Sequence, residues 1–317
     1  MRSLIALAAC CIMLQGIAQD TTVVSAMSAP LQQKQAEPAH IFYSPRLINM
    51  TTVQALRKGV LEFRVVHNFG DAGGDLGGIK NFFGLDNAAD VRIGFWYGLS
   101  DRVNIAAARY KGSGPVQQLY ELALKYVVLQ QAENDLRKPL SLALFANQVV
   151  SGMKAGTNPE SENAFGDEFS NRLSNVVQLM IARKFGKRLS LQLSPSYVHR
   201  NFVLPYDEKS LFALGAALRL HLGGRYSLLV DYAHTFRGQG VIDSFAARNI
   251  HFRDVLGVGL EILTGGHVFH LNFTNATDIL ENRFLARTVT SWGKGQFRWG
   301  FTVSRDFDLL WKKRNKK

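Results

Sequence analysis

Cysteine is nearly absent from this chain of 317 residues, whose two cysteines are the neighbours Cys10 and Cys11. Both lie in a hydrophobic N-terminal stretch, so the rest of the chain is not a small scaffold stabilised by disulfides. Long hydrophobic runs are missing too: beyond the N-terminus, no stretch approaches the roughly 18 to 20 apolar residues of a transmembrane helix. This absence excludes helical spanning only, because a membrane β-barrel places about half of its strand residues on a polar lumen.

The first residues have the composition of an export signal. A positive charge at Arg2 precedes an apolar stretch at 4–14, and small residues at 16–18 provide a cleavage site. We expect residues 1–18 to be a signal peptide that is cleaved in the mature chain. Residues 19–57 are predicted to be a periplasmic segment, disordered at first and then, from about residue 40, packed against the near end of the folded domain.

Positive charge is in excess, with a formal net charge of +12 and an isoelectric point near 9.8. Much of the excess lies in the basic tail at 312–317, and the remaining cations are scattered singly along the chain. A nucleic-acid interface would gather them on one surface. We therefore predict no nucleic-acid partner, and we expect the tail to lie beside an anionic membrane.

The clearest strand pattern spans residues 83–110. Apolar side chains alternate with charged or small ones from Val91 to Gly98, and again from Val103 to Ala108. This period of two is typical of strands, and the Gly-Leu-Ser-Asp sequence between the two stretches is typical of a turn. The region is predicted to be a β-hairpin.

The same pattern recurs between residues 58 and 311 to give about twelve strands, and we expect their long and short connections to alternate strictly. We therefore predict an all-β fold: a transmembrane, antiparallel, up-and-down β-barrel with periplasmic short turns and extracellular long loops. A soluble β-sandwich is the alternative, but it has no reason to sort its loops by length. Aromatic side chains near strand ends would form the interfacial belts; these are Tyr97, Tyr120, Tyr226, Tyr232, Trp299 and Phe307.

The first third of the chain after the signal contains five stretches in a recognisable order: Arg46-Leu47-Ile48-Asn49, residues 58–64 with His67 and 69–70, residues 83–89, residues 97–102, and Leu124-Lys125-Tyr126. In these stretches the chain resembles a family of bacterial outer-membrane β-barrels, typical of Bacteroidetes, that is classified as a domain of unknown function. The resemblance implies the same fold and an outer-membrane location, and it implies no catalytic residues.

The strand pattern places several charged side chains on the lumen side. Such charges need water or an opposite charge nearby. Two arrangements meet this need: a water-filled pore lined by fixed charges, or a closed lumen connected by ion pairs. The residues predicted to line the lumen are Glu62, Arg64, Arg92, Glu121, Lys125, Arg172, Arg219, Asp231, Glu261 and Arg298.

Motifs for other chemistry are absent. His267 and His270 fall on opposite faces of a strand, so they are not expected to share a metal ion. No nucleophile elbow or dinucleotide fingerprint is present, and no cofactor or catalytic residue is predicted. An outer-membrane hydrolase remains the less favoured enzyme alternative, since catalytic triads assemble in space rather than in sequence.

We therefore expect an integral outer-membrane barrel in contact with membrane lipid. The favoured function is a porin-like passive channel for small hydrophilic solutes, because a charged, glycine-containing lumen lies behind an apolar exterior. The alternative is a plugged barrel with a structural or envelope-interaction role and no transport, whose long loops fold inward or bind an external partner. The sequence identifies neither the solute nor a protein partner.

Overall fold

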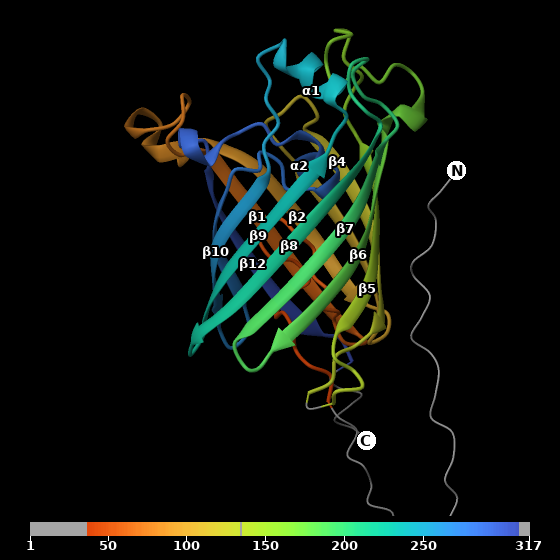
Figure 1. Cartoon of the computed structure of the whole chain (residues 1–317), viewed down its shortest axis with the longest axis vertical. Helices are drawn as coiled ribbons and strands as arrows, with labels where there is room; N and C mark the ends of the chain where they lie inside the picture. Colours follow the sequence, from red (N-terminus) through yellow and green to blue (C-terminus); the bar gives the residue numbers. More distant parts are fainter. Residues whose placement is uncertain (1–36, 134, 311–317) are drawn as a thin grey trace, which may run out of the picture. The chain divides into compact units, whose positions relative to one another are not determined.

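The computed structural model describes residues 37–133 and 135–310, which form one closed antiparallel barrel of twelve strands (Figure 1). Each strand pairs with its sequence neighbours, and the last strand closes on the first, as predicted. The strands are β1 (Val60–Asp71), β2 (Ala88–Gly98), β3 (Val103–Lys111), β4 (Gln118–Leu129), β5 (Ser141–Ser151), β6 (Leu173–Phe185), β7 (Leu189–Arg200), β8 (Ser210–Gly223), β9 (Tyr226–Phe236), β10 (Val255–Leu263), β11 (Val268–Thr274) and β12 (Arg298–Asp308).

The two faces of the wall follow the period of two in the sequence. In β4, for example, Leu122 and Leu124 are exposed on the outside, whereas Ala123 and Lys125 are buried on the inside. The outer face is rich in Leu, Val, Ile and aromatic residues, as a wall in contact with hydrocarbon requires. No helix in the described ranges is long and apolar enough to cross a membrane.

The two ends of the barrel differ in their connections. At the short-turn end, β6–β7 and β8–β9 are joined by tight turns, whereas at the long-loop end the connections carry the helical segments. The alternation is not strict: the short-turn connection at 130–140 is longer than the long-loop connection at 112–117. The helical segments are η1 (Ile79–Gly84), η2 (Phe169–Arg172), α1 (Gln239–Ala246), α2 (Glu281–Arg287) and η3 (Trp292–Lys294).

The lumen is filled by two segments that enter from opposite ends. Residues 40–57, which we call the plug, lie inside the barrel, so the expectation that they pack against its near end needs correction. The connection at 275–297, which we call the lid, folds inward so that α2 is buried. The predicted signal peptide and basic tail lie outside the described residues.

Small side chains on the inner wall explain why the plug fits inside. Ala106, Ala123 and Ala143 pack in one cluster with Ile41, Leu47 and other plug residues. Gly257 on β10 lies so close to the plug that an added Cβ would be 2.7 Å from Asn49 Nδ2. The wall therefore leaves the volume that the plug occupies, a relationship that the alternation of strand residues does not reveal.

Candidate functional site

The plug enters at the short-turn end, turns between Arg46 and Thr51, and returns to begin β1. At its entry, Pro38 forms a β-bridge with Ala132, and the Ala39 N–H donates to Gln131 O at 2.8 Å. The connection at 130–140 thus binds the chain where it enters the barrel, and this contact explains why a connection at the short-turn end is long. The tip of the plug reaches the lid.

Two wall amides bind the backbone of the plug as a neighbouring strand would. The Leu56 N–H donates to Asn104 Oδ1 at 2.7 Å, and Asn104 Nδ2 donates to Leu56 O at 3.1 Å. In the same way, Val53 N–H donates to Gln192 Oε1 at 2.7 Å, while Gln192 Nε2 donates to Thr51 O at 2.8 Å. Because buried backbone groups need partners, these side chains let an irregular segment occupy the lumen.

Two charged wall residues continue this pattern. Asp231 accepts hydrogen bonds from the Asn49 and Met50 N–H groups at 2.7 and 3.0 Å, and from Asn49 Nδ2 at 2.8 Å. Lys125 Nζ donates to Gln54 O at 2.8 Å and lies 4.6 Å from the centre of the Trp96 ring. Within the described residues, the closest partners of Asp231 and Lys125 carry no opposite charge. Hydrogen bonds with the backbone of the plug stabilise both charges instead.

The plug and the lid meet at one buried ion pair. Arg46 Nη1 lies 2.8 Å from Glu281 Oε1 on α2, and both side chains are 1% exposed or less. Thr51 Oγ1 also donates to Glu281 Oε1 at 2.6 Å, and Arg46 Nη2 donates to Ile279 O at 3.1 Å. This contact closes the lumen between its two ends.

The lid is held to the rim by ion pairs. Glu162 lies 2.8 Å from Arg283 Nη1 and 2.6 Å from Arg287 Nη1, and Asp278 accepts from Tyr110 at 2.8 Å. Burial opposes the charged form of Glu162, but the two arginines outweigh it and lower the pKa of this carboxyl below its usual 4.5. Burial likewise opposes the charged form of Arg283, but Asp278 and Glu162 raise its pKa. The lid is therefore fastened by charges.

The structure places nine of the ten residues predicted to line the lumen on the inner wall, where all but Arg298 are buried and most are paired. The pairs that join two of them are Arg64–Glu62 at 3.0 Å, Arg92–Glu121 at 2.6 Å and Arg219–Glu261 at 2.7 Å. Arg298 pairs instead with Asp90 at 3.3 Å. Arg172 is different, because it lies in η2 at the rim and donates to the Met153 carbonyl.

Other residues of the site were not anticipated. Asn104 and Gln192 could have been identified from the sequence, because each is a polar residue on the inward face of a predicted strand. A search for charged lumen residues leaves out neutral amides. Arg46 and Asn49 belong to a stretch that carries the family resemblance, although nothing in the stretch indicates its position. Glu281 lies in a long loop without periodicity, so no sequence pattern identifies it.

A hollow of about 490 Å³ remains beside the plug at the short-turn end, lined in part by His40, Gln54, Arg57 and Arg102. At the long-loop end, the space between Glu162, Arg283 and Phe202 is only about 50 Å³. Within the described ranges, no group of three or more His, Cys, Asp and Glu side chains is arranged to hold a metal ion. The site is thus a filled lumen with more free space at the short-turn end than at the long-loop end.

Comparison with curated proteins finds no matching sequence. Solved structures with a similar barrel include the NanC porin (7% identity, TM-score 0.46, 78% of this chain and 98% of that one). The KdgM porin in complex with oligogalacturonate is 10% identical, with a TM-score of 0.47 over 78% of this chain and 99% of that one. An outer membrane channel from Pseudomonas putida F1 is 12% identical, with a TM-score of 0.47 over 80% and 98%. These similarities give no information about the solutes or partners of this chain.

The family comparison is more specific, because it covers both the plug and the whole barrel. The model of a family described as "Membrane bound beta barrel domain (DUF5777)" matches residues 42–307, from the plug to β12. This match confirms the resemblance seen in the first third of the chain and extends it to the last strand. The chain belongs to this family of membrane-bound β-barrels.

Proposed function

We propose that this protein is an outer-membrane, porin-like barrel whose channel is closed by the plug and conducts small hydrophilic solutes when the plug leaves. The observation that carries this proposal is the way the plug is bound. Asn104, Gln192 and Asp231 contact mainly backbone atoms of the plug, so they leave a polar wall when it departs. A wall built only to be filled would be apolar, since apolar packing avoids the cost of burying polar groups.

The charges of the wall support passage of hydrophilic solutes. Arg64–Glu62 and Arg92–Glu121 are paired within the wall itself, so both pairs keep their charge partners without the plug, although Arg64 would lose its hydrogen bond to Ser44. Asp231 would lose its hydrogen bonds to plug backbone, and Glu281 would lose Arg46. Loss of the plug therefore exposes two carboxylates and one amine, Lys125, so we expect the opened channel to favour cations.

A variant that fills the space of the plug tests this proposal. Gly257→Val places its Cβ 2.5 Å from the wall carboxylate Asp231, which binds the plug, and 2.7 and 2.9 Å from Asn49 and Ile48 of the plug. Gly265→Val adds the same side chain in a turn with no heavy atom within 4 Å of the added Cβ. In planar bilayers with potassium chloride, the native protein should be mostly silent. Gly257→Val should conduct in steps with a cation-selective reversal potential, and Gly265→Val should behave like the native protein.

A reversible tether separates movement of the plug from a general loosening of the barrel. Asn49→Cys with Asp231→Cys joins plug and wall at a pair of side chains that are in contact, in a chain whose other two cysteines are Cys10 and Cys11. The oxidised protein should be silent and the reduced protein should conduct. Equal conductance of both forms, in protein shown to be folded by heat-modifiable gel migration, would overturn gating by the plug.

The alternative is a plugged barrel with a structural or envelope-interaction role. The buried Arg46–Glu281 pair favours it, because this pair joins the plug to the lid and so closes the lumen from both ends. Silence of both Gly257→Val and the reduced tether variant, in folded protein, would support this second function.

Catalysis is not part of this proposal. His270 is fully buried, and its Nε2 lies 3.5 Å from Glu261 Oε2. Within the described residues, neither ring nitrogen of His270 has a hydrogen-bond partner, so this histidine gives no support to a triad, in which the base is hydrogen-bonded to a hydroxyl nucleophile. Hydrolysis of a lipid or peptide by the folded protein, lost on His270→Ala, would contradict this interpretation.

A further inference from the structure

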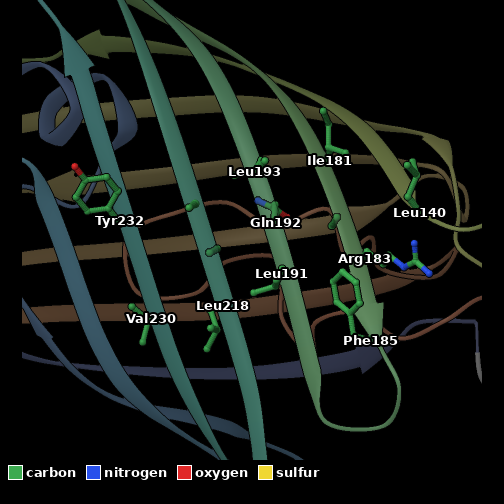
Figure 2. Close-up of a pocket in the computed structure, with 13 residues that line it drawn as sticks. Leu140, Ile181, Arg183, Phe185, Leu191, Gln192, Leu193, Leu218, Val230 and Tyr232 are labelled. Atoms are coloured by element: carbon green, nitrogen blue, oxygen red, sulfur yellow. The ribbon is translucent and has the colours of Figure 1, made fainter.

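The outer wall carries a hollow of about 500 Å³ over β6, β7, β8 and β9 (Figure 2). Its volume is in the range of small-molecule sites, and its lining is almost entirely apolar. The outer face of a membrane barrel meets lipid, so a hollow in this face is a site for a lipid chain rather than for a soluble ligand.

The register of the strands explains the hollow. Ala216 lies outward on β8 between Leu193 on β7 and Tyr232 on β9, in a row that continues to Ile181 on β6. Three large side chains therefore surround one methyl group. The next row toward the short-turn end holds larger residues again, with Leu218 between Leu191 and Val230.

The ladder between β6 and β7 is interrupted beside this hollow. Gln178 pairs with Ser196 and Ile181 pairs with Leu193, but the two pairs expected between them are missing. Pro195 lies in this gap, and proline has no N–H to donate to a neighbouring strand. Because proline is confined to edges and irregular positions in sheets, its presence here accounts for the local loss of ladder pairing, while the register on both sides of the gap is the same.

A cation lies at one end of the hollow. Arg183 is on the same outward face of β6, one row from Ile181 and two residues before the strand ends at Phe185. Its guanidinium lies 5.1 Å from the centre of the Phe185 ring, and no ion pair or hydrogen bond of its side chain is found within the described residues. Lys187 and Arg188 follow in the exposed turn.

We propose that this hollow binds an anionic phospholipid of the leaflet at the short-turn end. One acyl chain fills the space above Ala216, and the phosphate of the headgroup pairs with Arg183, with Lys187 and Arg188 adding to the positive potential. The apolar hollow and the adjacent unpaired cation match the two parts of such a lipid. Basic sites beside membrane-spanning segments bind anionic headgroups in this way.

Lipid retention tests this site directly. The full-length protein is purified in detergent with equal amounts of phosphatidylglycerol and phosphatidylcholine, and retained lipid is measured by native mass spectrometry. The native protein should retain phosphatidylglycerol preferentially. Arg183→Gln should lower that preference about fivefold, the change expected for one cation near a charged lipid surface. Arg225→Gln, at an exposed arginine in the β8–β9 turn outside the hollow, is the matched control and should change it little.

Two further outcomes decide the proposal. Ala216→Phe fills the hollow and should reduce retention of both lipids, and Ala216→Leu is available if the larger residue disturbs folding. Equal effects of Arg183→Gln and Arg225→Gln would mean that only the general surface potential attracts lipid, and the proposal would fail. It would also fail if the folded Ala216 variants retained as much phosphatidylglycerol as the native protein.

Discussion

The plug and the lid both fill the lumen, but the wall holds them by different chemistry. Wall side chains bind the plug through its backbone, as Asn104 binds Leu56 and Gln192 binds Val53. The lid also receives hydrogen bonds at its backbone, from Thr235 and Arg237, but its main fastening is the pair of lid arginines, Arg283 and Arg287, on Glu162. Backbone recognition does not depend on the sequence of the plug or on its charge, whereas ion pairs depend on pH, salt and residue identity. The hold on the plug backbone should therefore depend less on pH and salt than the hold on the lid.

The largest effect is expected where the two regions meet. Glu281→Ala leaves the guanidinium of Arg46 buried without its charge partner, which costs about 3 to 5 kcal/mol in the free energy of unfolding. Urea unfolding, followed by heat-modifiable gel migration, measures the loss. The double variant Arg46→Ala with Glu281→Ala should lose less than the sum of the single variants, because it leaves no unpaired charge. Additive losses would mean that the pair does not join plug and lid.

The next prediction compares the wall with the plug at one contact. Asp231→Ala leaves the N–H groups of Asn49 and Met50 buried without acceptors, so the expected loss is about 2 to 4 kcal/mol. Asn49→Ala removes the side-chain hydrogen bond to the same carboxylate and the one that Asn49 accepts from Thr274, and it should cost about 1 to 2 kcal/mol. Urea unfolding of both variants provides the measurement. A larger loss for Asn49→Ala would show that the plug is recognised by its side chains.

The third prediction uses pH to loosen the lid alone. Because the folded pKa of Glu162 is lowered, its ion pairs contribute stability above the usual value of 4.5, and this contribution is lost as the pH falls through the folded pKa. Amide hydrogen exchange of α2, corrected for the intrinsic effect of pH, should rise in that range, whereas exchange in the plug should change little. Glu162→Gln should give fast exchange of α2 already at pH 7, at a cost of about 1 to 2 kcal/mol. Equal increases in the exchange rates of plug and lid would mean that the two segments are not held by different chemistry.

The fold was predictable because its signals are local. The period of two in β4, with Leu122 and Leu124 outward and Lys125 inward, follows directly from the geometry of a strand. The number of strands and the lengths of their connections then determine a closed barrel. The family match from 42 to 307 adds that the plug belongs to the same unit as the barrel.

The contents of the lumen were not predictable for a physical reason. Residues 40–57 have no regular secondary structure, so no periodicity indicates a buried face, and their burial depends on wall residues far away in sequence, such as Gln192 and Asp231. The sequence pattern predicts that the glycines of the lumen face belong to a polar pore. In the structure, Gly257 instead makes room for the plug.

The smallest effect is expected at the base of the plug. Lys184 pairs with Glu133 at 3.1 Å beside the bridge between Pro38 and Ala132, but this pair is partly exposed to solvent. Lys184→Gln should therefore change the free energy of unfolding by less than about 1 kcal/mol, and added salt should remove the difference. Gln131→Ala is the contrasting variant, because the Gln131 amide binds both the N–H and the carbonyl of Lys184 at 2.8 and 2.9 Å. A loss for Lys184→Gln as large as for Gln131→Ala would mean that charge also fastens the connection that holds the chain where it enters the barrel, and the chemical difference from the lid would be smaller than proposed.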